Sequence, residues 1–455
     1  MTLARILFAL ACLLATPAHA QGADGDAPAL PDYIVERFGT PPAIPTGPLS
    51  PEVEDAIRVV FVDSLERSRW GEPEQEALAV IAASGDPRLA WIIADMMRFT
   101  WRLGFDNALA QAASTLTGLE FNRPRRWGIL TDHLIAWDIP APPDYLETKR
   151  AIFTRFLPGL EGIFVEGDLD WRIVSWGGVL IDDRVFGDPE ICNCIPAADN
   201  PGVSSAAEAD WLAEEAIVFG LVINGEARAY PRRIMEVREM VNDTLGGRDL
   251  GIPYCTLCGA AQAYFTDAVP EGVARPILRT SGLLSRSNKV MYDLNTRSVF
   301  DTFLGHAVTG PLAEAGVALP RAGLVTTTWG DWKRAHPETT VLVEALALGR
   351  DFNFREGRDA AGPIFPVGDV DPRLEVQDDV IGALTASGTP VAFPHGAALL
   401  ALRDGREVRF EDIEIVLTAG GLKAQRTDGS DPGGHDAFWF AWSQFHPDTA
   451  VWQPL

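Results

Sequence analysis

Cys255 and Cys258 are the residues whose spacing most directly indicates chemistry. Two cysteines separated by two residues can cycle between dithiol and disulfide, supply half of a tetrahedral metal site, or form a permanent disulfide. Gly259 follows directly and favours a metal-binding turn, which needs a positive φ. The apolar segment 260–265 predicts a strand, whereas a thioredoxin-type motif would start a helix. In the redox alternative, Cys255 is the more exposed thiolate and Cys258 its resolving partner.

Cys192 and Cys194 are the other cysteines that lie beyond the first twenty residues. With the first pair they would complete an all-cysteine metal site or form two disulfides. An even number of cysteines is typical of structural disulfides in an exported protein. The cysteine pattern therefore leaves the cofactor unknown, and a metal ion bound by the cysteines is one of the alternatives.

The histidines and serines form no recognisable catalytic motif. His336 and His446 each precede a proline in a repeated W-x-x-x-H-P block, which predicts a structural turn at a helix end. The sequence has no H-x-x-x-H spacing, no G-x-S-x-G elbow and no phosphate-binding or dinucleotide-binding loop. A carbohydrate-active site would need two carboxylates facing one cleft, which the sequence does not identify. Whether the protein is an enzyme therefore stays open.

The composition excludes several classes of protein. The chain has 455 residues, of which 47% are hydrophobic and 22% are charged, as in an ordinary globular protein. Its formal net charge of -25 argues against nucleic-acid binding, because little positive charge is available to neutralise phosphates. No later segment has the roughly 20 uncharged apolar residues that a membrane helix needs. We expect no nucleic-acid partner and no stable membrane insertion.

Residues 1–20 have the pattern of a signal peptide. Arg5 supplies the positive start, residues 6–15 are an apolar run, and the segment ends in a small-x-small cleavage site at Ala20. We therefore expect cleavage after Ala20 and a periplasmic or secreted product. Such a compartment is oxidising and permits disulfides.

The next part of the chain predicts a linker and then helices. Residues 21–50 are rich in Pro, Gly and Ala, which is typical of an extended linker. Residues 51–160 carry apolar residues at helical spacing, with helices expected over 51–65, 74–83, 89–101 and 107–119. Short helices joined by turns weakly resemble HEAT-type repeats, and a plain helical bundle explains them equally well.

The rest of the chain predicts a strand-rich α+β fold. Alternating apolar segments indicate strands over 217–222, 227–230, 251–254 and 260–265, with helices near 232–241 and 328–335.

Two sequence blocks occur twice in this region. The block at 225–231 matches 388–394, and W-x-x-x-H-P-x-T at 332–339 matches 442–449. We therefore expect an internally duplicated domain, with a first α+β module over 161–345 and a shortened copy over 346–455. Ligand sites often form where such modules meet, so a small-molecule or protein partner is expected there. The oligomeric state is not indicated.

Several blocks, taken in order, resemble one known family. They are Ile195-Pro196, Ala209-Asp210, N-G-E-A-R-A-Y-P at 224–231, V-N-D-T at 241–244, Y-C-x-x-C-G at 254–259, S-G-L-L at 281–284, M-Y-D at 291–293 and F-W-F-A-W at 438–442. The pattern resembles the domain of unknown function 3179 family over about residues 194–451. No established activity comes with that resemblance.

The resemblance draws attention to polar residues around the V-N-D block. The binding candidates are Arg238, Glu239, Asn242, Asp243 and Tyr254. The family usually has a His-Glu pair where this chain has Arg238 and Glu239, so a ligand or base held by that His would be missing. Thr256 replaces a usual Pro. Cys192 and Cys194 lie outside the usual pattern, which favours a local disulfide between them.

Two hypotheses follow for the function. In the first, the chain is a periplasmic thiol protein whose Cys255/Cys258 pair is redox-active or binds a metal, with a nearby Arg238 lowering a thiol pKa. In the second, the chain is a non-catalytic scaffold that binds a ligand or protein, with all cysteines in structural disulfides. Cysteine accessibility and metal content distinguish the two.

Overall fold

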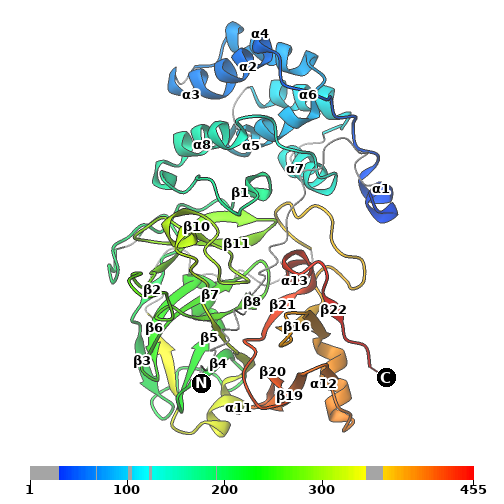
Figure 1. The fold of residues 1–455 in the computed structure, drawn as a ribbon. Helices are drawn as coiled ribbons and strands as arrows, with labels where there is room; N and C mark the ends of the chain where they lie inside the picture. Colours follow the sequence, from blue (N-terminus) through cyan, green and yellow to red (C-terminus); the bar gives the residue numbers. More distant parts are fainter. Residues whose placement is uncertain are drawn as a thin grey trace, which may run out of the picture.

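The structure consists of a helical part and a strand-rich part (Figure 1). The computed structural model describes residues 30–67, 69–100, 105–121, 125–190, 192–344 and 362–454. The signal peptide predicted over residues 1–20 lies outside the described residues. The helices of the first part are α1 (Asp32–Phe38), α2 (Pro51–Arg58), a π-helical turn (Val59–Asp63), α3 (Ser64–Arg67), α4 (Glu72–Ala83), α5 (Ala90–Thr100), α6 (Asp106–Thr117), α7 (Arg126–Ala136) and α8 (Tyr145–Phe156).

Local signals explain where these helices begin and end. The Ser50 hydroxyl accepts a hydrogen bond from the backbone N–H of Val53 at 3.3 Å, and Pro51 is the first residue of α2. The helix α6 ends at Gly118, whose φ of 74° is accessible to glycine at little cost. These caps satisfy backbone groups that the helices leave unpaired at their ends.

The core of the helical part is centred on α5, which is buried on nearly all sides. Asp95 of α5 is buried with it, and it accepts hydrogen bonds from Lys149 Nζ at 2.7 Å and from the Tyr145 hydroxyl at 2.8 Å. Burial raises the pKa of Asp95, and the Lys149 ammonium opposes that shift. The polar triad therefore fixes α8 against α5.

The strand-rich part consists of five small sheets in a propeller-like arrangement (Figure 1). Their strand orders are β1-β10-β11-β12; β13-β9-β7-β6-β2, with β8 paired to β7; β14-β4-β5-β15-β3; β21-β16-β17-β22; and β18-β19-β20. The strands are β1 (Val174–Trp176), β2 (Ala198–Asp199), β3 (Gly202–Ser205), β4 (Ile217–Ile223), β5 (Glu226–Pro231), β6 (Met240–Leu245), β7 (Arg248–Cys255), β8 (Ala260–Ala261), β9 (Ala263–Phe265), β10 (Leu278–Ser285), β11 (Asn288–Asp293), β12 (Val299–Phe300), β13 (Arg321–Ala322), β14 (Val325–Thr328), β15 (Thr340–Val343), β16 (Asp379–Leu384), β17 (Pro390–Pro394), β18 (Arg409–Phe410), β19 (Ile413–Thr418), β20 (Gly421–Arg426), β21 (His435–Phe438) and β22 (Ala450–Val451). Short helices between them are α9 (Arg232–Arg238), α10 (Gly310–Glu314), α11 (Trp329–Ala335), α12 (His395–Arg403) and α13 (Trp439–Phe445).

The predicted architecture, a helical domain followed by a duplicated α+β domain, was wrong for the strand-rich part. Five separate small sheets stand where two α+β modules were expected. Alternating apolar residues indicate a strand, but they do not indicate its neighbour in a sheet. For example, β15 pairs in parallel with β5, more than a hundred residues earlier, and antiparallel with β3.

Two of the five sheets share one local design. The orders β14-β4-β5-β15 and β21-β16-β17-β22 both contain two antiparallel pairings followed by a parallel one. Gly220 lies under the Trp332 ring and Gly382 under the Trp442 ring, and a Cβ at either glycine would overlap the indole. Each glycine therefore allows a tryptophan to lie flat on its strand.

The same two sheets also fix their tryptophans by the same hydrogen bond. Trp332 Nε1 donates to Thr339 Oγ1 and Trp442 Nε1 donates to Thr449 Oγ1, both at 2.9 Å. The repeated W-x-x-x-H-P-x-T blocks thus each form a helix end, a turn and the start of a strand.

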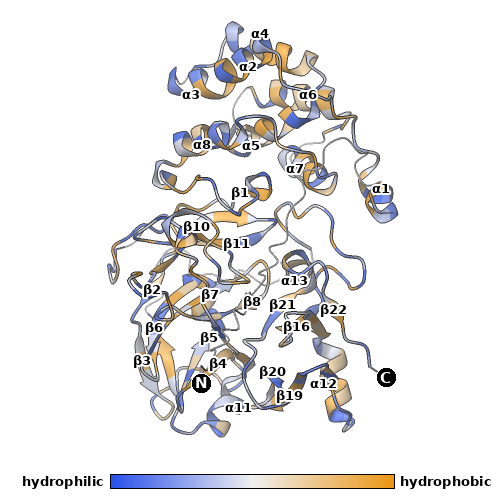
Figure 2. Ribbon diagram, in the orientation of Figure 1, coloured by the Kyte–Doolittle hydropathy of each residue, from blue (hydrophilic) through white to orange (hydrophobic). Residues whose placement is uncertain are grey.

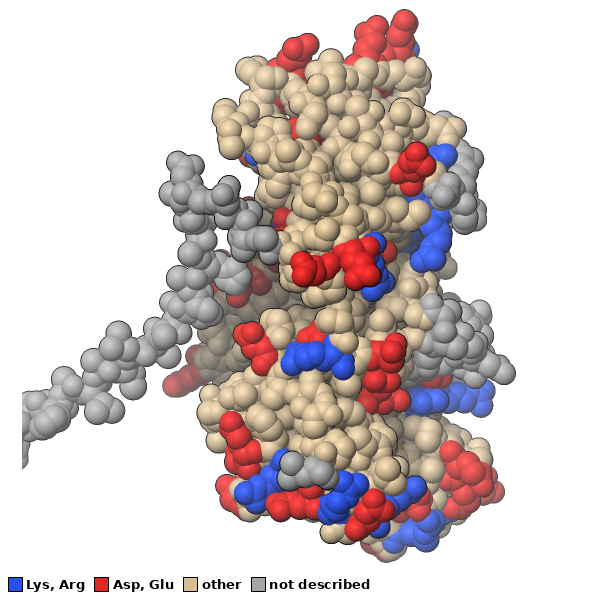
Figure 3. All heavy atoms as spheres, turned by 90° about the vertical axis from the view of Figure 1, so that its right-hand side faces the viewer, with Lys and Arg blue, Asp and Glu red and all other residues tan. Residues whose placement is uncertain are grey.

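The helical part packs on the first sheet, because Leu283 of β10 and Val290 of β11 belong to the same buried cluster as the side chains of α5 and α8. Helices such as α2 are hydrophilic on one side and hydrophobic on the other (Figure 2). On the face drawn in Figure 3, Lys and Arg side chains lie among Asp and Glu side chains. Within the described residues, no helix has the length and apolar character needed to cross a membrane.

Candidate functional site

The Cys255–Cys258 pair forms a disulfide at the end of β7, with its Cα atoms 5.4 Å apart. The carbonyl of Cys258 accepts a hydrogen bond from the backbone N–H of Phe438, the last residue of β21, at 2.8 Å. Gly259 has a φ of 63°, and a Cβ there would lie 3.1 Å from the Phe438 ring. The fourth sheet therefore covers the turn, leaving Cys255 2% and Cys258 0% exposed.

A cavity of about 110 Å³ lies beside Cys255 and is lined by an ion pair and two hydroxyl groups. Lys289 Nζ lies 2.9 Å from Glu239 Oε2 and donates to Thr280 Oγ1 at 2.7 Å. Thr256 Oγ1 donates to Glu239 Oε1 at 3.2 Å. A positive and a negative group are thus held together next to the disulfide.

The backbone of Glu239 is fixed on both sides. Its φ is 51°, an uncommon value for a residue with a side chain. Its N–H donates to the Met235 carbonyl at 2.8 Å, which ends α9, and its carbonyl accepts from the Tyr254 N–H at 3.0 Å. The sharp turn between α9 and β6 therefore brings the Glu239 carboxylate to the cavity.

A larger cavity of about 410 Å³ shares Lys289 with the first one. Asn288 Nδ2 donates to Gln444 Oε1 of α13 at 3.2 Å across its wall. The Asp301 carboxylate accepts two backbone N–H groups, each at 2.8 Å. Burial raises the pKa of Asp301, although these N–H groups act in the opposite direction. Groups of both charges therefore line this cavity.

Arg238 and Tyr254, both predicted as site residues, do not line either of these cavities. Arg238 Nε lies 2.9 Å from Glu344 Oε2. Tyr254 is fully buried, with its ring 5.1 Å from that of Phe219. The cation near Cys255 is thus Lys289.

Asp243 and Asn242 belong to other polar networks. Arg228 NH1 donates to both oxygens of Asp243, at 2.8 and 2.7 Å, and the Tyr230 hydroxyl donates to Asp243 at 2.8 Å. Asn242 Nδ2 donates to Asp199 Oδ1 at 2.9 Å. The V-N-D block therefore positions strands within the core of the second and third sheets.

Cys192 and Cys194 form the second disulfide, with their Cα atoms 5.1 Å apart. Within the described residues, Asp182, Cys192 and Cys194 form the only group of three or more His, Cys, Asp or Glu side chains whose ligand atoms all lie within 4.8 Å of one another. Cys255 and Cys258 are not in that group, so the structure does not gather the four cysteines into one site.

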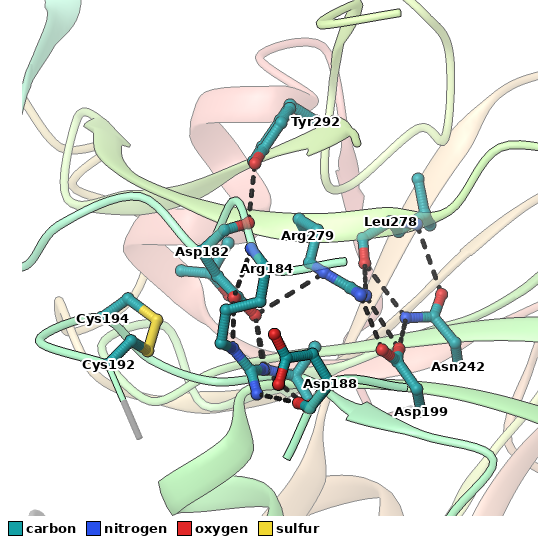
Figure 4. Close-up of polar contacts among 12 residues, drawn as sticks. Asp182, Arg184, Asp188, Cys192, Cys194, Asp199, Asn242, Leu278, Arg279 and Tyr292 are labelled. Carbon is teal, nitrogen blue, oxygen red and sulfur yellow. Dashed lines mark hydrogen bonds and ion pairs between the residues drawn. A yellow bond between two sulfur atoms is a disulfide. The ribbon is translucent and has the colours of Figure 1, made fainter. Parts of the chain in front are cut away.

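A buried charge network lies next to the Cys192–Cys194 disulfide (Figure 4). Arg184 donates to both oxygens of Asp182, at 2.7 and 3.0 Å, and Arg279 donates to both oxygens of Asp199, at 2.8 and 2.6 Å. The Tyr292 hydroxyl donates to the Asp182 carbonyl at 2.7 Å. The Asp182 carboxylate is thus already paired with arginine side chains of the protein. The network also connects the segment around Asp182 to β10 and β11.

The comparisons with known proteins identify the family. A family model described as a protein of unknown function, DUF3179, matches residues 192–431, just over half of the chain. The chain belongs to the DUF3179 family. This confirms the resemblance that the sequence blocks indicated. No curated protein and no solved structure matches the chain.

Lys289 is the site residue that the sequence analysis missed. It lies in the DUF3179 region, two residues before the M-Y-D block. Every residue of β11 is buried, including Asn288 and Lys289 at its start. A lysine directly before the apolar run Val290–Tyr292 was the available signal, because a buried lysine needs a partner.

Proposed function

We propose that this DUF3179 protein is an exported binding protein whose four cysteines outside the predicted signal peptide form structural disulfides. The observation that carries the proposal is that both cysteine pairs are bonded within themselves, with Cys194, Cys255 and Cys258 at most 2% exposed. A bonded, buried cysteine offers no thiolate to a metal or a substrate. Export rests on the pattern of residues 1–20 and is consistent with disulfides formed in an oxidising compartment.

The ligand in this proposal is a small polar molecule in the cavity of about 410 Å³. Sites that enclose small molecules typically measure roughly 300–1,000 Å³. Asn288 and Lys289 reach the cavity from β11, Asp301 from the loop after β12, and Gln444 from α13. Donors and acceptors from three separate segments can therefore orient one ligand.

The binding proposal is tested by thermal unfolding of the purified mature protein against amino acids, sugars and small dicarboxylates. A ligand that binds only the folded chain raises Tm with its concentration. Gln444→Ala should remove or strongly reduce the shift, because it deletes a polar group of the wall. Gln425→Ala is the matched control, since Gln425 lies on β20 and bonds to Glu414 outside this cavity.

Thiol counting tests the disulfide half of the proposal separately. The intact mass should show no thiol available for alkylation before denaturation, and both disulfides should persist in a mild reductant. Bound metal accompanied by reactive thiols would overturn it. A panel in which no compound raises the Tm of the wild-type protein would overturn the choice of cavity.

A redox function is the second candidate, because Cys255 lines the smaller cavity close to Lys289. An ammonium group near a cysteine favours its thiolate. Reduction would transfer two electrons and two protons from a dithiol donor to the Cys255–Cys258 disulfide, leaving two thiols here and a disulfide in the donor. This function would be favoured if mild reductant opened that disulfide while Cys192–Cys194 stayed closed.

A further inference from the structure

A third cavity, of about 260 Å³, lies between the helical part and residues 364–366. Its lining includes Met97 and Arg98 of α5, Trp127 of α7 and Phe365. Apart from Arg98, these side chains are apolar. The cavity thus has apolar walls around the Arg98 guanidinium, and Arg125 and Asp132 are its other charged lining residues.

Arg98 is held by aromatic rings and one carbonyl. Its Cζ lies 4.7 Å from the centre of the Trp127 ring, 5.0 Å from that of Trp176 and 5.8 Å from that of Phe365. Its Nε donates to the Trp176 carbonyl at 2.7 Å. These contacts fix the plane of the guanidinium, and they satisfy only part of its five N–H donors.

No carboxylate in the described ranges lies within ion-pair distance of Arg98, although most arginines of this chain have one. Burial lowers the pKa of Arg98 to about 10, and no acid opposes that shift. The group therefore stays positively charged at neutral pH. A charge removed from water without a counter-ion is costly, so an anion in the cavity would recover free energy.

Asp132 lines the same cavity but does not serve as that counter-ion. Its Oδ1 accepts the backbone N–H groups of Val367 and Gly368, at 2.8 and 3.0 Å. This carboxylate therefore fixes the chain that follows Phe365 in place. Arg125, which is exposed, adds a second cation at the cavity.

We propose that this cavity binds a small organic acid, with its carboxylate on Arg98 and an aromatic or branched apolar body against Met97, Trp127 and Phe365. A planar guanidinium matches a carboxylate with two parallel hydrogen bonds, and the apolar walls exclude water from them. This site is separate from the polar cavity proposed above, so either proposal can fail alone.

The test uses benzoate as the probe in calorimetric titration of the full mature chain, with benzyl alcohol and inorganic phosphate as comparisons. Benzoate should bind the wild-type protein, and Arg98→Gln should weaken it at least about tenfold, as expected for loss of a charge-assisted pair. Arg58→Gln is the control, because Arg58 is an exposed arginine of α2 paired with Asp55 and Asp63. The Arg58→Gln variant should bind benzoate with the same affinity as the wild-type protein.

A second variant covers the case in which Arg98→Gln does not fold. Arg125→Gln changes an exposed side chain and should weaken benzoate about two- to fivefold, the effect of a more distant, solvent-screened charge. The proposal is overturned if benzoate does not bind at millimolar concentration, or if benzyl alcohol or phosphate binds equally well. It is also overturned if folded Arg98→Gln binds benzoate as tightly as the wild type, because Arg98 would then be only a cation–π contact between the two parts.

Discussion

The third and fourth sheets follow the same plan but differ in the chemistry that surrounds them. Each has a tryptophan lying on a strand glycine and bonded to a threonine seven residues later. In each sheet a hairpin, β4–β5 or β16–β17, is followed by a short helix and a further hairpin, β6–β7 after α9 and β19–β20 after α12. In the first case β7 leads into the Cys255–Cys258 turn, whereas β20 ends at Arg426 and contributes no residue to either cavity near that turn.

The difference teaches that the shared plan is a scaffold, and that the segment following β5 reaches the polar cavity whereas the matching segment following β17 does not. Glu239 ends α9 in a left-handed conformation and reaches the cavity beside Cys255, but α12 ends with Asp404 at a φ of -78°. The fourth sheet instead supplies Phe438, which covers the disulfide turn. The polar groups of the small cavity come from the first and second sheets and the turns beside them, and the fourth sheet closes over the disulfide turn, as expected when function is carried by a site on a scaffold.

The largest expected effect tests whether the two scaffolds are equivalent. Trp332→Ala and Trp442→Ala should each lower the free energy of unfolding by about 3–5 kcal/mol, because each opens a large cavity over its glycine. Urea unfolding measures both. Trp211→Ala is the control, since this side chain is 48% exposed and should change stability by less than about 1 kcal/mol. Unequal losses of unfolding free energy for the Trp332 and Trp442 variants would show that the third and fourth sheets are not equivalent scaffolds.

Removing the cation of the site should have an effect of similar size. Lys289→Met leaves the Glu239 carboxylate buried without its ammonium partner, which should cost about 3 kcal/mol. Lys423→Met on β20 removes a partly exposed ion pair with Asp431, in which the charged atoms lie 3.4 Å apart, and should cost less than about 1 kcal/mol. The double variant Lys289→Met/Glu239→Gln should recover part of the loss in denaturant unfolding. Equal losses for the two lysine variants would contradict the view that the buried Lys289–Glu239 pair stabilises the fold more than the Lys423–Asp431 pair.

The matched histidines should respond differently to pH. Burial lowers the pKa of His446 to about 4, while half-buried His336 shows a lowered pKa from the same cause. An unfolded histidine titrates near 6.5, so the stability given by neutral His446 is complete above that pH and is lost as pH falls toward 4.

The loss at His446 should reach about 2–3 kcal/mol by pH 4.5. His446→Gln should flatten the stability profile between pH 6.5 and 4.5 more than His336→Gln does, as measured by urea unfolding at several pH values. The reverse order would show that the two turns are not buried as described.

The disulfides should give the smallest effect. They close loops of only four and three residues, so by chain entropy each should contribute about 2 kcal/mol or less. Replacing Cys255 and Cys258 by Ala should cost somewhat more than replacing Cys192 and Cys194, because the first pair belongs to a buried cluster with Phe438. Guanidinium unfolding of both variants measures the difference. A larger loss for the Cys192/Cys194 variant would contradict this ranking.

Local features of this fold were predictable from the sequence, and distant pairings were not. Helix 74–83 is confirmed as α4, and strand 217–222 as β4, because their periodicity and end signals are contained in the segment itself. The helix expected to reach residue 241 ends at Arg238, since Glu239 turns the chain into β6. Sheet membership depends on partners far along the chain, which a periodic pattern does not contain.

The site was predictable only in part for the same reason. The spacing of Cys255 and Cys258 is a local feature of the sequence, and it correctly indicated the turn beside which the small cavity lies. Glu239 was named from the family pattern, but its partner Lys289 lies fifty residues later, and the two meet because β11 of the first sheet packs near the start of β6 in the second. Spacing along the chain does not show such a contact.

Phe365 lines both the cavity of Arg98 and the small cavity beside Cys255. Because the Phe365 ring lines both cavities, any movement of the ring that makes room for a ligand in one cavity also changes the volume of the other. Linkage then requires reciprocity: whatever factor an acid at Arg98 imposes on affinity beside Cys255, an occupant there imposes equally on the acid. The ligand affinity of each cavity thus reports on whether the other cavity is occupied.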